Sequence, residues 1–391
     1  MITQRYLENN ILADLKEKMV FVGGPRQVGK TTFAKQLGKQ YHKNSLYLNW
    51  DNREDRKNIM SFVFPSDTDM IIFDEIHKYR PWKSHLKGLY DKWGNTYNII
   101  VTGSARLDLY RRGGDSLMGR YHYYRLHPFS LREAAHETPD LRIFEQPPFM
   151  ERGSFDDLYG ALLNFGGFPE PFLSRDETVS RRFHNERVER LVKEDIRDVE
   201  TIKDLGSLLV LVGMLPEKVG SLLSINSLRE DLQVAHKTVS NWIEILERFY
   251  YQFRIYPFTA NTIKSLRKEP KLYLWDWSEI SNPAARLENM VASHLLKTVH
   301  WLYDTQGYKA ELFFLRDKEG REMDFLVTIN RKPWFSVEVK TNDDEISPSV
   351  KYFGNKLKIP FQYQLIQKND VDYTREGIRV MGIKKFLSGL V

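Results

Sequence analysis

The chain has 391 residues, a net charge of +6 and 41% hydrophobic residues, which predicts two or three globular domains rather than a disordered chain. It has no cysteine, which excludes disulfides, thiolate zinc sites and a cysteine nucleophile. The N-terminus lacks the layout of a signal peptide, and the longest apolar run, residues 208–215, is too short to cross a bilayer. We therefore expect a cytoplasmic protein with no membrane partner.

The first motif follows a helix and a strand. Residues 1–18 are expected to form a helix, and residues 19–23, Met-Val-Phe-Val-Gly, have the composition of a buried strand. The next residues fill every fixed position of the phosphate-binding loop G-x-x-x-x-G-K-[ST], and residues 32–37 continue as a helix. The predicted nucleotide-binding residues are Gly24, Pro25, Arg26, Gln27, Val28, Gly29, Lys30, Thr31 and Thr32.

The residue types in this loop suit ATP and Mg²⁺, the two predicted cofactors. Gly24 and Gly29 let the backbone turn its N–H groups towards phosphate oxygens. Lys30 supplies a cation for the β- and γ-phosphates, and the Thr31 hydroxyl is expected to hold Mg²⁺. The alternative is a Gly-rich turn that precedes a helix by chance, which the strand before the loop disfavours.

Two acids end a later apolar strand. Residues 45–50 are the expected second strand, and residues 69–75, Asp-Met-Ile-Ile-Phe-Asp-Glu, form a Walker B pattern. Asp74 is expected beside Mg²⁺, as a direct ligand or through a water, and Glu75 is expected to polarise the water that attacks the γ-phosphate. Without the phosphate-binding loop upstream, two acids that merely end a strand would be the better interpretation.

The rest of this domain supplies two further catalytic candidates. Residues 97–104 predict a buried strand, at whose end Ser104 or Thr102 could contact the attacking water or the γ-phosphate; a plain Ser-Gly turn is the alternative. Arg120, just before the strand of residues 121–126, is the candidate arginine finger for a neighbouring subunit's nucleotide. A surface position is the alternative for it and for three earlier arginines, Arg106, Arg111 and Arg112.

With these motifs, the chain resembles AAA+ ATPases of the archaeal-ATPase type, whose C-terminal part is an uncharacterised domain with a restriction-endonuclease-like core. The resemblance implies an ATPase fold and self-association, so a homo-oligomer is expected, but it implies no biological role. It covers almost the whole chain and rests on residues 24–31, 71–75, 102–104, 119–120, 127–130 and 166–169.

Residues 139–204 are expected to form a helical linker. Residues 139–148 are rich in proline and charge, and the pattern becomes helical from residue 155. Gly166-Gly167-Phe168-Pro169-Glu170 breaks that pattern, and residues 179–199 predict a long charged helix.

Residues 205–260 have the pattern of a winged helix. Residues 227–230, Ser-Leu-Arg-Glu, read as a capping box that opens one helix, residues 238–249 form a second helix, and residues 250–256 form a strand. The second helix could read DNA or RNA, or it could pack against protein. Its candidate contacts are His236, Lys237, Ser240 and Asn241.

Residues 261–391 contain a second set of candidate residues. Alternation along residues 335–340 places Glu338 and Lys340 on one face of a strand, and Glu288 lies on the apolar side of an expected helix. The order resembles the PD-(D/E)XK nuclease core, which implies that carboxylates hold Mg²⁺ and that the lysine positions water. An edge strand with alternating charge is the alternative. The candidate residues are Glu288, Asp324, Glu338 and Lys340.

The expected fold class is α/β. A parallel-sheet P-loop NTPase domain of the AAA+ type in residues 1–138 is followed by the linker in 139–204, the winged helix in 205–260 and a restriction-endonuclease-like domain in 261–391. The leading hypothesis is an ATP hydrolase that couples Mg²⁺-dependent hydrolysis to a task on DNA or RNA. The alternatives are a nucleotide-gated signalling or interaction module without cleavage activity, and an ATP-regulated nuclease.

Overall fold

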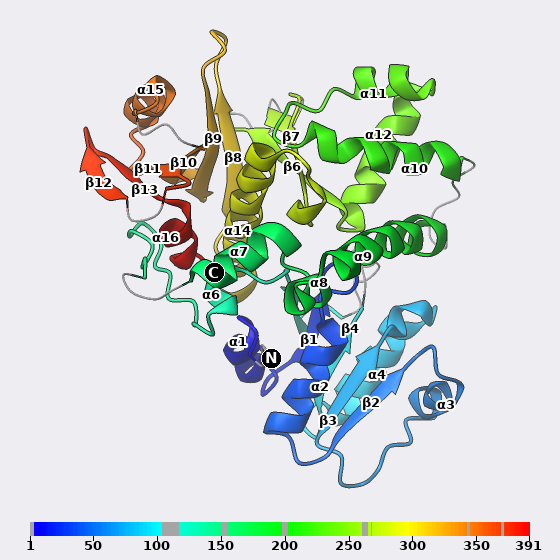
Figure 1. The fold of residues 1–391 in the computed structure, drawn as a ribbon. Helices are drawn as coiled ribbons and strands as arrows, with labels where there is room; N and C mark the ends of the chain where they lie inside the picture. The colour runs from blue at the N-terminus through cyan, green and yellow to red at the C-terminus, as the bar shows by residue number, and fades with distance from the viewer. Residues whose placement is uncertain are drawn as a thin grey trace. The chain divides into compact units, whose positions relative to one another are not determined.

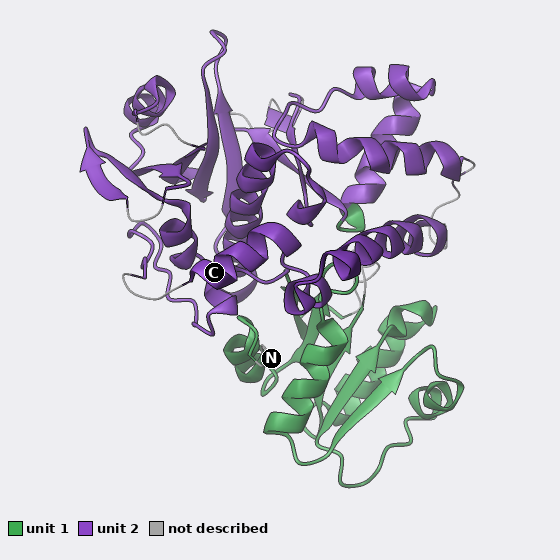
Figure 2. Cartoon of the chain, viewed as in Figure 1, with its two compact units in different colours: residues 1–127, 248–250 green, residues 128–247, 251–391 purple. Residues whose placement is uncertain are grey.

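The chain folds into two compact units in a computed structural model (Figures 1 and 2). The N-terminal unit comprises residues 1–127 and 248–250, and the C-terminal unit comprises residues 128–247 and 251–391. The residues that the structure describes are 4–103, 117–150, 155–197, 202, 204–259, 265–266, 268–341, 345–368 and 371–391.

The N-terminal unit is built on a five-stranded parallel sheet in the order β2-β3-β4-β1-β5, which confirms the predicted parallel α/β sheet. Because all five strands run in one direction, their carboxyl ends meet at one edge, where ligands bind in sheets of this type. The strands are β1 (Met19–Gly23), β2 (Ser45–Asn49), β3 (Met70–Asp74), β4 (Asn98–Thr102) and β5 (Tyr121–Arg125).

Helices cover both faces of this sheet. Ile71 and Phe73 of β3 pack in one apolar cluster with Leu86 of α4, whereas Ile72 faces Gly38 of α2. Burial on both faces explains why the strand sequences are continuously apolar rather than alternating. The helices are α1 (Glu8–Asp14), which is shorter than the expected helix of residues 1–18, α2 (Lys30–Tyr41), α3 (Arg53–Ser61), the 3₁₀ turn η1 (Ile76–Lys78) and α4 (Trp82–Trp93).

The first half of the C-terminal unit is helical. The expected long helix of residues 179–199 ends earlier, because α9 passes into a π-helical segment at Leu191. Its elements are α6 (Leu131–Ala134), α7 (Asp156–Phe165), α8 (Pro169–Ser174), α9 (Glu177–Arg190), η2 (Leu191–Ile196), α10 (Leu205–Met214), η3 (Leu215–Lys218), α11 (Ile225–Leu232) and α12 (His236–Arg248).

The predicted capping box at residues 227–230 is wrong. Helix α11 begins at Ile225, and the hydroxyl of Ser224 accepts a hydrogen bond from the Ser227 amide at 3.3 Å. Ser224 has the extended backbone of an N-cap, whereas Ser227 already lies inside the helix. Ser227 has a glutamate three residues later, which fits the capping-box pattern, but the backbone conformation places the cap at Ser224.

The second half of the C-terminal unit carries a mixed eight-stranded sheet in the order β12-β13-β11-β10-β9-β8-β6-β7 (Figure 1). Strands β8, β9 and β10 are antiparallel neighbours, and β11 runs parallel to β10. The strands are β6 (Gln252–Pro257), β7 (Lys271–Leu274), β8 (Ala310–Arg316), β9 (Glu322–Ile329), β10 (Lys332–Lys340), β11 (Phe361–Ile366), β12 (Asp372–Arg375) and β13 (Ile378–Gly382).

The strand expected at residues 250–256 is β6, and it belongs to this sheet, because it pairs with β8 on one side and β7 on the other. Helix α15 packs on the sheet through Val350 and Phe353, which share an apolar cluster with Phe313 of β8 and Met323 of β9. The helices are η4 (Trp277–Glu279), α14 (Pro283–Gln306), α15 (Pro348–Leu357) and α16 (Ile383–Ser388). Among the described residues, no helix has the length and apolarity to cross a membrane.

Candidate functional site

The phosphate-binding loop joins β1 to α2 and has a backbone that its glycines permit. Gly24 has φ +136°, and a Cβ at this position would lie 2.4 Å from the backbone oxygen of Leu126. Gly29 has φ +93° and forms the N-cap of α2. Any other residue at Gly24 would have to move the backbone around Leu126, so the loop is specific for glycine there.

Lys30 lies against its own loop. Its Nζ atom donates to the carbonyl oxygens of Gly24 at 3.0 Å and Pro25 at 2.6 Å, and the side chain is buried. These hydrogen bonds hold a cation within the loop, and phosphate oxygens would be stronger acceptors for it than neutral carbonyls. By contrast, Thr32, also a predicted nucleotide-binding residue, is exposed.

Asp74, at the carboxyl end of β3, accepts hydrogen bonds from three hydroxyl groups. The hydroxyl groups of Thr31 and Tyr47 donate to Oδ2 at 2.8 and 2.9 Å, and the hydroxyl of Thr102 donates to Oδ1 at 2.7 Å. Strand register explains part of this arrangement, because Asp74 pairs with Asn49 of β2 and with Thr102 of β4. The structure therefore brings the predicted metal ligands Thr31 and Asp74 into contact.

Glu75 follows Asp74 in a conformation that is uncommon for a residue with a side chain. Its φ is +57°, and its amide donates to the carbonyl oxygen of Thr102 at 3.1 Å. The carboxylate lies 3.4 Å from Nε2 of His77 and 3.7 Å from Nζ of Lys78. Burial raises the pKa of Glu75 above its usual value, which makes the carboxylate a better proton acceptor.

Arg120 is not brought to this site. Strands β1 and β5 are parallel, with Met19 beside Tyr121 and Gly23 beside Arg125, so Arg120 lies at the amino ends of the strands. A five-residue strand spans roughly 16 Å, and the phosphate-binding loop follows its other end. The guanidinium instead pairs with Asp91, at 2.6 and 3.2 Å. Ser104, Arg106, Arg111 and Arg112 lie outside the described residues.

Sequence reasoning missed Tyr47. Residues two apart on a strand share a face, so Tyr47 lies on the same face of β2 as Asn49, which is the register partner of Asp74. The spacing of Tyr47 and Asn49 is visible in the sequence. It pointed to Asp74 only once β2 was known to lie beside β3.

The Thr31 and Asp74 side chains offer only oxygen atoms, which are the ligands that Mg²⁺ prefers. We therefore regard the pair as a fit for the ion that accompanies ATP. Across the described ranges of the chain, no group of three or more His, Cys, Asp or Glu side chains is arranged to hold a metal ion.

The four candidate residues of the C-terminal unit, Glu288, Asp324, Glu338 and Lys340, do come together. We call the three acids among them, together with Glu322 of β9, the acidic cluster. The amide of Asp324 donates to Glu338 Oε2 at 3.4 Å, and the Glu338 carboxylate lies 2.9 Å from Nζ of Lys340. The hydroxyl of Tyr273 donates to Glu288 at 2.7 Å. Burial first, and then the Asp324 charge, raise the pKa of Glu288 and of Glu338 to about 7.

Lys271 contacts this cluster, and sequence reasoning missed it. Its Nζ atom lies 2.8 Å from Glu322, 3.3 Å from Asp324 and 3.5 Å from Glu288. The side chain is 3% exposed. Burial lowers the pKa of Lys271, but the carboxylates outweigh it and hold the pKa above its usual value, so the ammonium stays charged.

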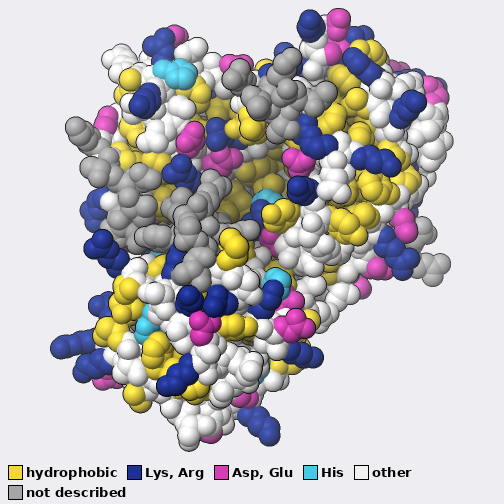
Figure 3. Space-filling view, turned by 180° about the vertical axis from the view of Figure 1, so that it is seen from behind, with side chains coloured by type: hydrophobic (Ala, Val, Ile, Leu, Met, Phe, Trp, Pro, Cys, Tyr) yellow, Lys and Arg dark blue, Asp and Glu magenta, His cyan; other side chains and the backbone are white. Residues whose placement is uncertain are grey.

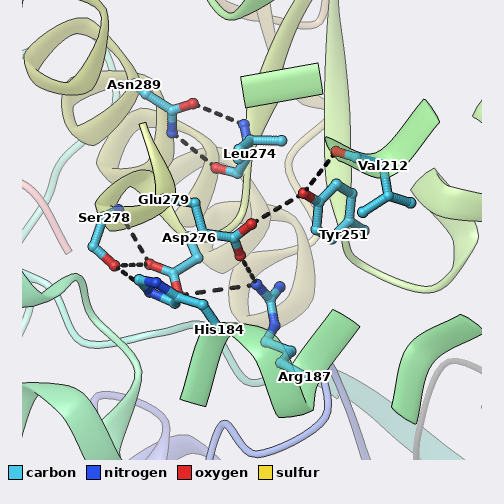
Figure 4. Close-up of polar contacts among 9 residues, drawn as sticks. All are labelled: His184, Arg187, Val212, Tyr251, Leu274, Asp276, Ser278, Glu279 and Asn289. Atoms are coloured by element: carbon cyan, nitrogen blue, oxygen red, sulfur yellow. Dashed lines mark hydrogen bonds and ion pairs between the residues drawn. The ribbon is translucent and has the colours of Figure 1, made fainter. Parts of the chain in front are cut away.

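A second polar network of the C-terminal unit joins α9 to η4 (Figure 4). Asp276 is fully buried and accepts hydrogen bonds from the amide and hydroxyl of Ser278 at 3.2 and 2.6 Å. Nε2 of His184 lies 3.0 Å from the Ser278 hydroxyl and 3.5 Å from Asp276 Oδ2. Burial alone would raise the pKa of Asp276, but His184 and Arg187 hold it below its usual value.

Arg187 is the cation at the centre of this network. Its Nη1 atom lies 2.7 Å from Oε1 of Glu279 and 3.9 Å from Oδ2 of Asp276. The hydroxyl of Tyr251 donates to the second oxygen of Glu279 at 3.0 Å. The guanidinium also lies 4.4 Å from the ring centroid of Phe168. Each buried charge here therefore has a partner of opposite charge, as burial requires, while Asp276 Oδ2 accepts no hydrogen bond.

The same network explains the Gly166-Gly167-Phe168-Pro169 motif. Gly166 has φ +75°, and a Cβ there would lie 2.5 Å from Oδ1 of Asp276. A Cβ on Gly167 would lie 2.6 Å from the carbonyl oxygen of Phe129 and 2.8 Å from the Trp277 ring. The motif is therefore a packing requirement of this turn, which the sequence alone did not reveal.

Comparison with known families assigns the first part of the chain. Residues 16–135 match the family model of an AAA domain. This match confirms the predicted AAA-type P-loop domain, a type of domain that implies nucleotide binding. Two further family models match, both domains of unknown function: DUF8612 over residues 156–281 and DUF4143 over residues 285–386.

Relatives extend along most of the chain but carry no assigned activity. The uncharacterized protein MJ1544 of Methanocaldococcus jannaschii is 24% identical over 93% of this chain and 84% of its own length. An uncharacterized protein of Haemophilus influenzae is 22% identical over 98% of both chains.

Two solved structures show weak likeness to this chain. The Thermotoga maritima RuvB Holliday junction branch migration motor covers 68% of this chain and 92% of that chain at 18% identity, with a TM-score of 0.30. A structure from work on the structural basis of katanin self-assembly covers 62% of this chain and 87% of that chain at 13% identity, with a TM-score of 0.28. Likeness at these TM-scores carries no argument about this chain.

Proposed function

We propose that this protein hydrolyses ATP at the loop of residues 24–31, with Thr31, Asp74 and Glu75 completing the site. The observation that carries the proposal is the contact between the Thr31 hydroxyl and Asp74 at 2.8 Å, which joins the loop to the end of β3. This contact supports the proposal because it joins the two residues expected to hold Mg²⁺, and Glu75, the residue expected to activate water, follows Asp74 in the chain.

Each residue has a distinct task in this proposal. The Lys30 ammonium leaves the carbonyl oxygens of Gly24 and Pro25 and binds the β- and γ-phosphates. Thr31 and Asp74 would hold Mg²⁺, which neutralises phosphate charge when it is bound. Glu75 accepts a proton from the water whose oxygen attacks the γ-phosphorus, and the bond from that phosphorus to the β–γ bridging oxygen breaks to give ADP and phosphate.

The Lys30→Ala variant tests nucleotide use. We expect it to lose ATP binding and phosphate release, because no other cation of the loop reaches the phosphates in this scheme. The matched control is Lys39→Ala, which removes an exposed lysine from the same helix. Binding of a fluorescent ATP analogue and Mg²⁺-dependent phosphate release are the measurements. Release that is unchanged in Lys30→Ala, or absent from the wild type, would contradict the proposal.

We further propose that Arg120 acts in a homo-oligomer, at the nucleotide of a neighbouring subunit. Its place at the amino ends of the strands, away from the phosphate-binding loop, supports a role at a neighbour's nucleotide rather than at its own. The ion pair between Arg120 and Asp91 lies at the surface, so a phosphate of a neighbouring subunit's nucleotide could compete with Asp91 for the guanidinium.

A nucleic-acid task is the second part of the proposal, and the exposed start of α12 favours it. Helices α11 and α12 are joined by residues 233–235, as in a helix-turn-helix, and His236, Lys237 and Asn241 are exposed. Figure 3 shows Lys and Arg dispersed among Asp and Glu on the face drawn, rather than gathered in one patch. On the face drawn, binding would therefore depend on a few local side chains.

The Lys237→Glu variant tests this part. We expect it to bind a fluorescein-labelled DNA duplex or RNA strand roughly tenfold more weakly than the wild type, measured by anisotropy at low salt. Lys318→Glu makes the same charge change on the exposed turn before β9 and is the control. Wild-type affinity in Lys237→Glu, or no binding at all, would favour the nucleotide-gated interaction module instead.

A further inference from the structure

The acidic cluster surrounds a cation that belongs to the chain. Nζ of Lys271 lies within 3.5 Å of three of its carboxylates, those of Glu288, Glu322 and Asp324. The fourth, Glu338, accepts a hydrogen bond from the Asp324 amide and pairs with Lys340. The ammonium therefore occupies the position between acids from β9 and α14.

The backbone of Lys271 is held from both sides. Lys271 pairs with Ile255 of β6 and forms a bridge with Leu222 on its other side. Next to it, the carbonyl oxygen of Leu272 accepts a hydrogen bond from the Gly220 amide at 3.0 Å. Because the strand is paired on both edges and the side chain is 3% exposed, this lysine differs from a surface lysine that samples solvent.

The backbone at Gly220 also packs against the Glu288 carboxylate. Gly220 has φ +75°, and a Cβ at that position would lie 3.2 Å from one carboxylate oxygen of Glu288 and 3.3 Å from the other. The other neighbours of this carboxylate are the Tyr273 hydroxyl and the Lys271 ammonium. The Gly220 backbone, the Tyr273 hydroxyl and the Lys271 ammonium thus lie against the Glu288 carboxylate, whose side chain is 21% exposed.

A divalent cation does not fit this arrangement. Mg²⁺ requires oxygen ligands at about 2.0–2.1 Å and retains several waters, so it would need the oxygens that Lys271 contacts. A buried ammonium beside such an ion would also repel it strongly, since the interior screens charge less than water does. Accordingly, no metal-holding group of His, Cys, Asp and Glu is found among the described residues.

We propose that Lys271 is the resident cation of the acidic cluster and takes the place that the nuclease resemblance gives to Mg²⁺. The wild-type protein then binds no divalent cation at Asp324, and the cluster stabilises the C-terminal unit instead of cutting a phosphodiester. This inference is independent of ATP hydrolysis, which uses residues of the N-terminal unit.

Mn²⁺ binding to the full chain without nucleotide tests the proposal. Free Mn²⁺ is counted by electron paramagnetic resonance in the wild type, Asp324→Asn, Lys271→Met and Lys271→Met/Asp324→Asn. Comparison of each protein with its Asp324→Asn counterpart isolates this cluster from the phosphate-binding loop. We expect the wild type and Asp324→Asn to bind alike, whereas Lys271→Met binds at least roughly tenfold more tightly and loses the gain in the double variant.

The control for loss of a lysine is Lys318→Met, which changes an exposed residue and should bind Mn²⁺ as the wild type does. Binding in the wild type that Asp324→Asn removes would overturn the proposal, and this comparison remains decisive if Lys271→Met does not fold. A folded Lys271→Met that gains no binding would also overturn it, because the cluster would then not be a cation site that Lys271 fills.

Discussion

Replacement of Glu75 with glutamine is expected to lower phosphate release by about 10²–10⁴-fold while ATP binding is retained. Glutamine keeps the size of the side chain and its ability to hydrogen-bond a water, but it accepts no proton. The loop of residues 24–31 and the Thr31–Asp74 contact are untouched by the change, so the variant should trap ATP. Phosphate release in a single turnover, measured beside equilibrium ATP binding, separates the two effects.

Glu54→Gln is the matched control for this prediction, because Glu54 is an exposed residue in the first turn of α3 and lies outside the site. Its phosphate release should equal that of the wild type. If Glu75→Gln also turned over at the wild-type rate, another group would have to activate the water. A joint loss of binding and turnover would assign Glu75 to the structure of the site rather than to the chemical step.

The largest effect on stability is expected from Arg187→Met. Methionine preserves much of the side-chain length, but it leaves the buried carboxylates of Asp276 and Glu279 without their guanidinium. Removal of one partner of a buried charge pair costs roughly 3–5 kcal/mol, because the remaining charge is uncompensated. Hydrogen exchange of peptides that cover α9 and η4 should report a loss of this size in the free energy of local opening.

Arg181→Met, on the same helix, provides the control. Arg181 is 64% exposed and its partner Glu177 is 84% exposed, so we expect a change below about 1 kcal/mol. Addition of Glu279→Gln to Arg187→Met should recover part of the loss, because one of the two stranded charges is then neutral. Equal effects of Arg187→Met and Arg181→Met would show that the network of Figure 4 contributes little.

The N-terminal unit was the more predictable part of the fold. Its strands are short apolar runs that end in polar residues, and the loop and the Walker B acids are contiguous in the sequence. Motifs of this kind can be identified without knowing which strands are neighbours in the sheet. Burial on both faces of β3 made the run of residues 70–73 uniformly apolar, so it was readable as a strand of a parallel sheet.

Prediction was weaker where one pattern suits two structures. Two serines, Ser224 and Ser227, could each mark the start of α11, and the structure assigns the cap to Ser224. The strand after α12 was expected in a winged helix, but its pairing with β8 depends on residues about 57 positions later, as in the pair Tyr256 and Phe313. Sequence pattern specifies the strand but not its partner.

The sequence by itself determined the phosphate-binding loop and the adjacent acids Asp74 and Glu75, because neighbours in the chain suffice to define those motifs. It also indicated the candidate acids of the C-terminal unit, from the residue pattern of each separate segment. The tertiary structure alone decided which side chains surround them. Tyr47 reaches Asp74 because β2 lies beside β3, and Arg120 lies away from the loop because β5 is parallel to β1. Lys271 enters the acidic cluster because β7 pairs with β6, which places a lysine where the spacing of the acids had suggested a metal ion. Strand order and register are properties of the whole sheet, and a single segment does not contain them.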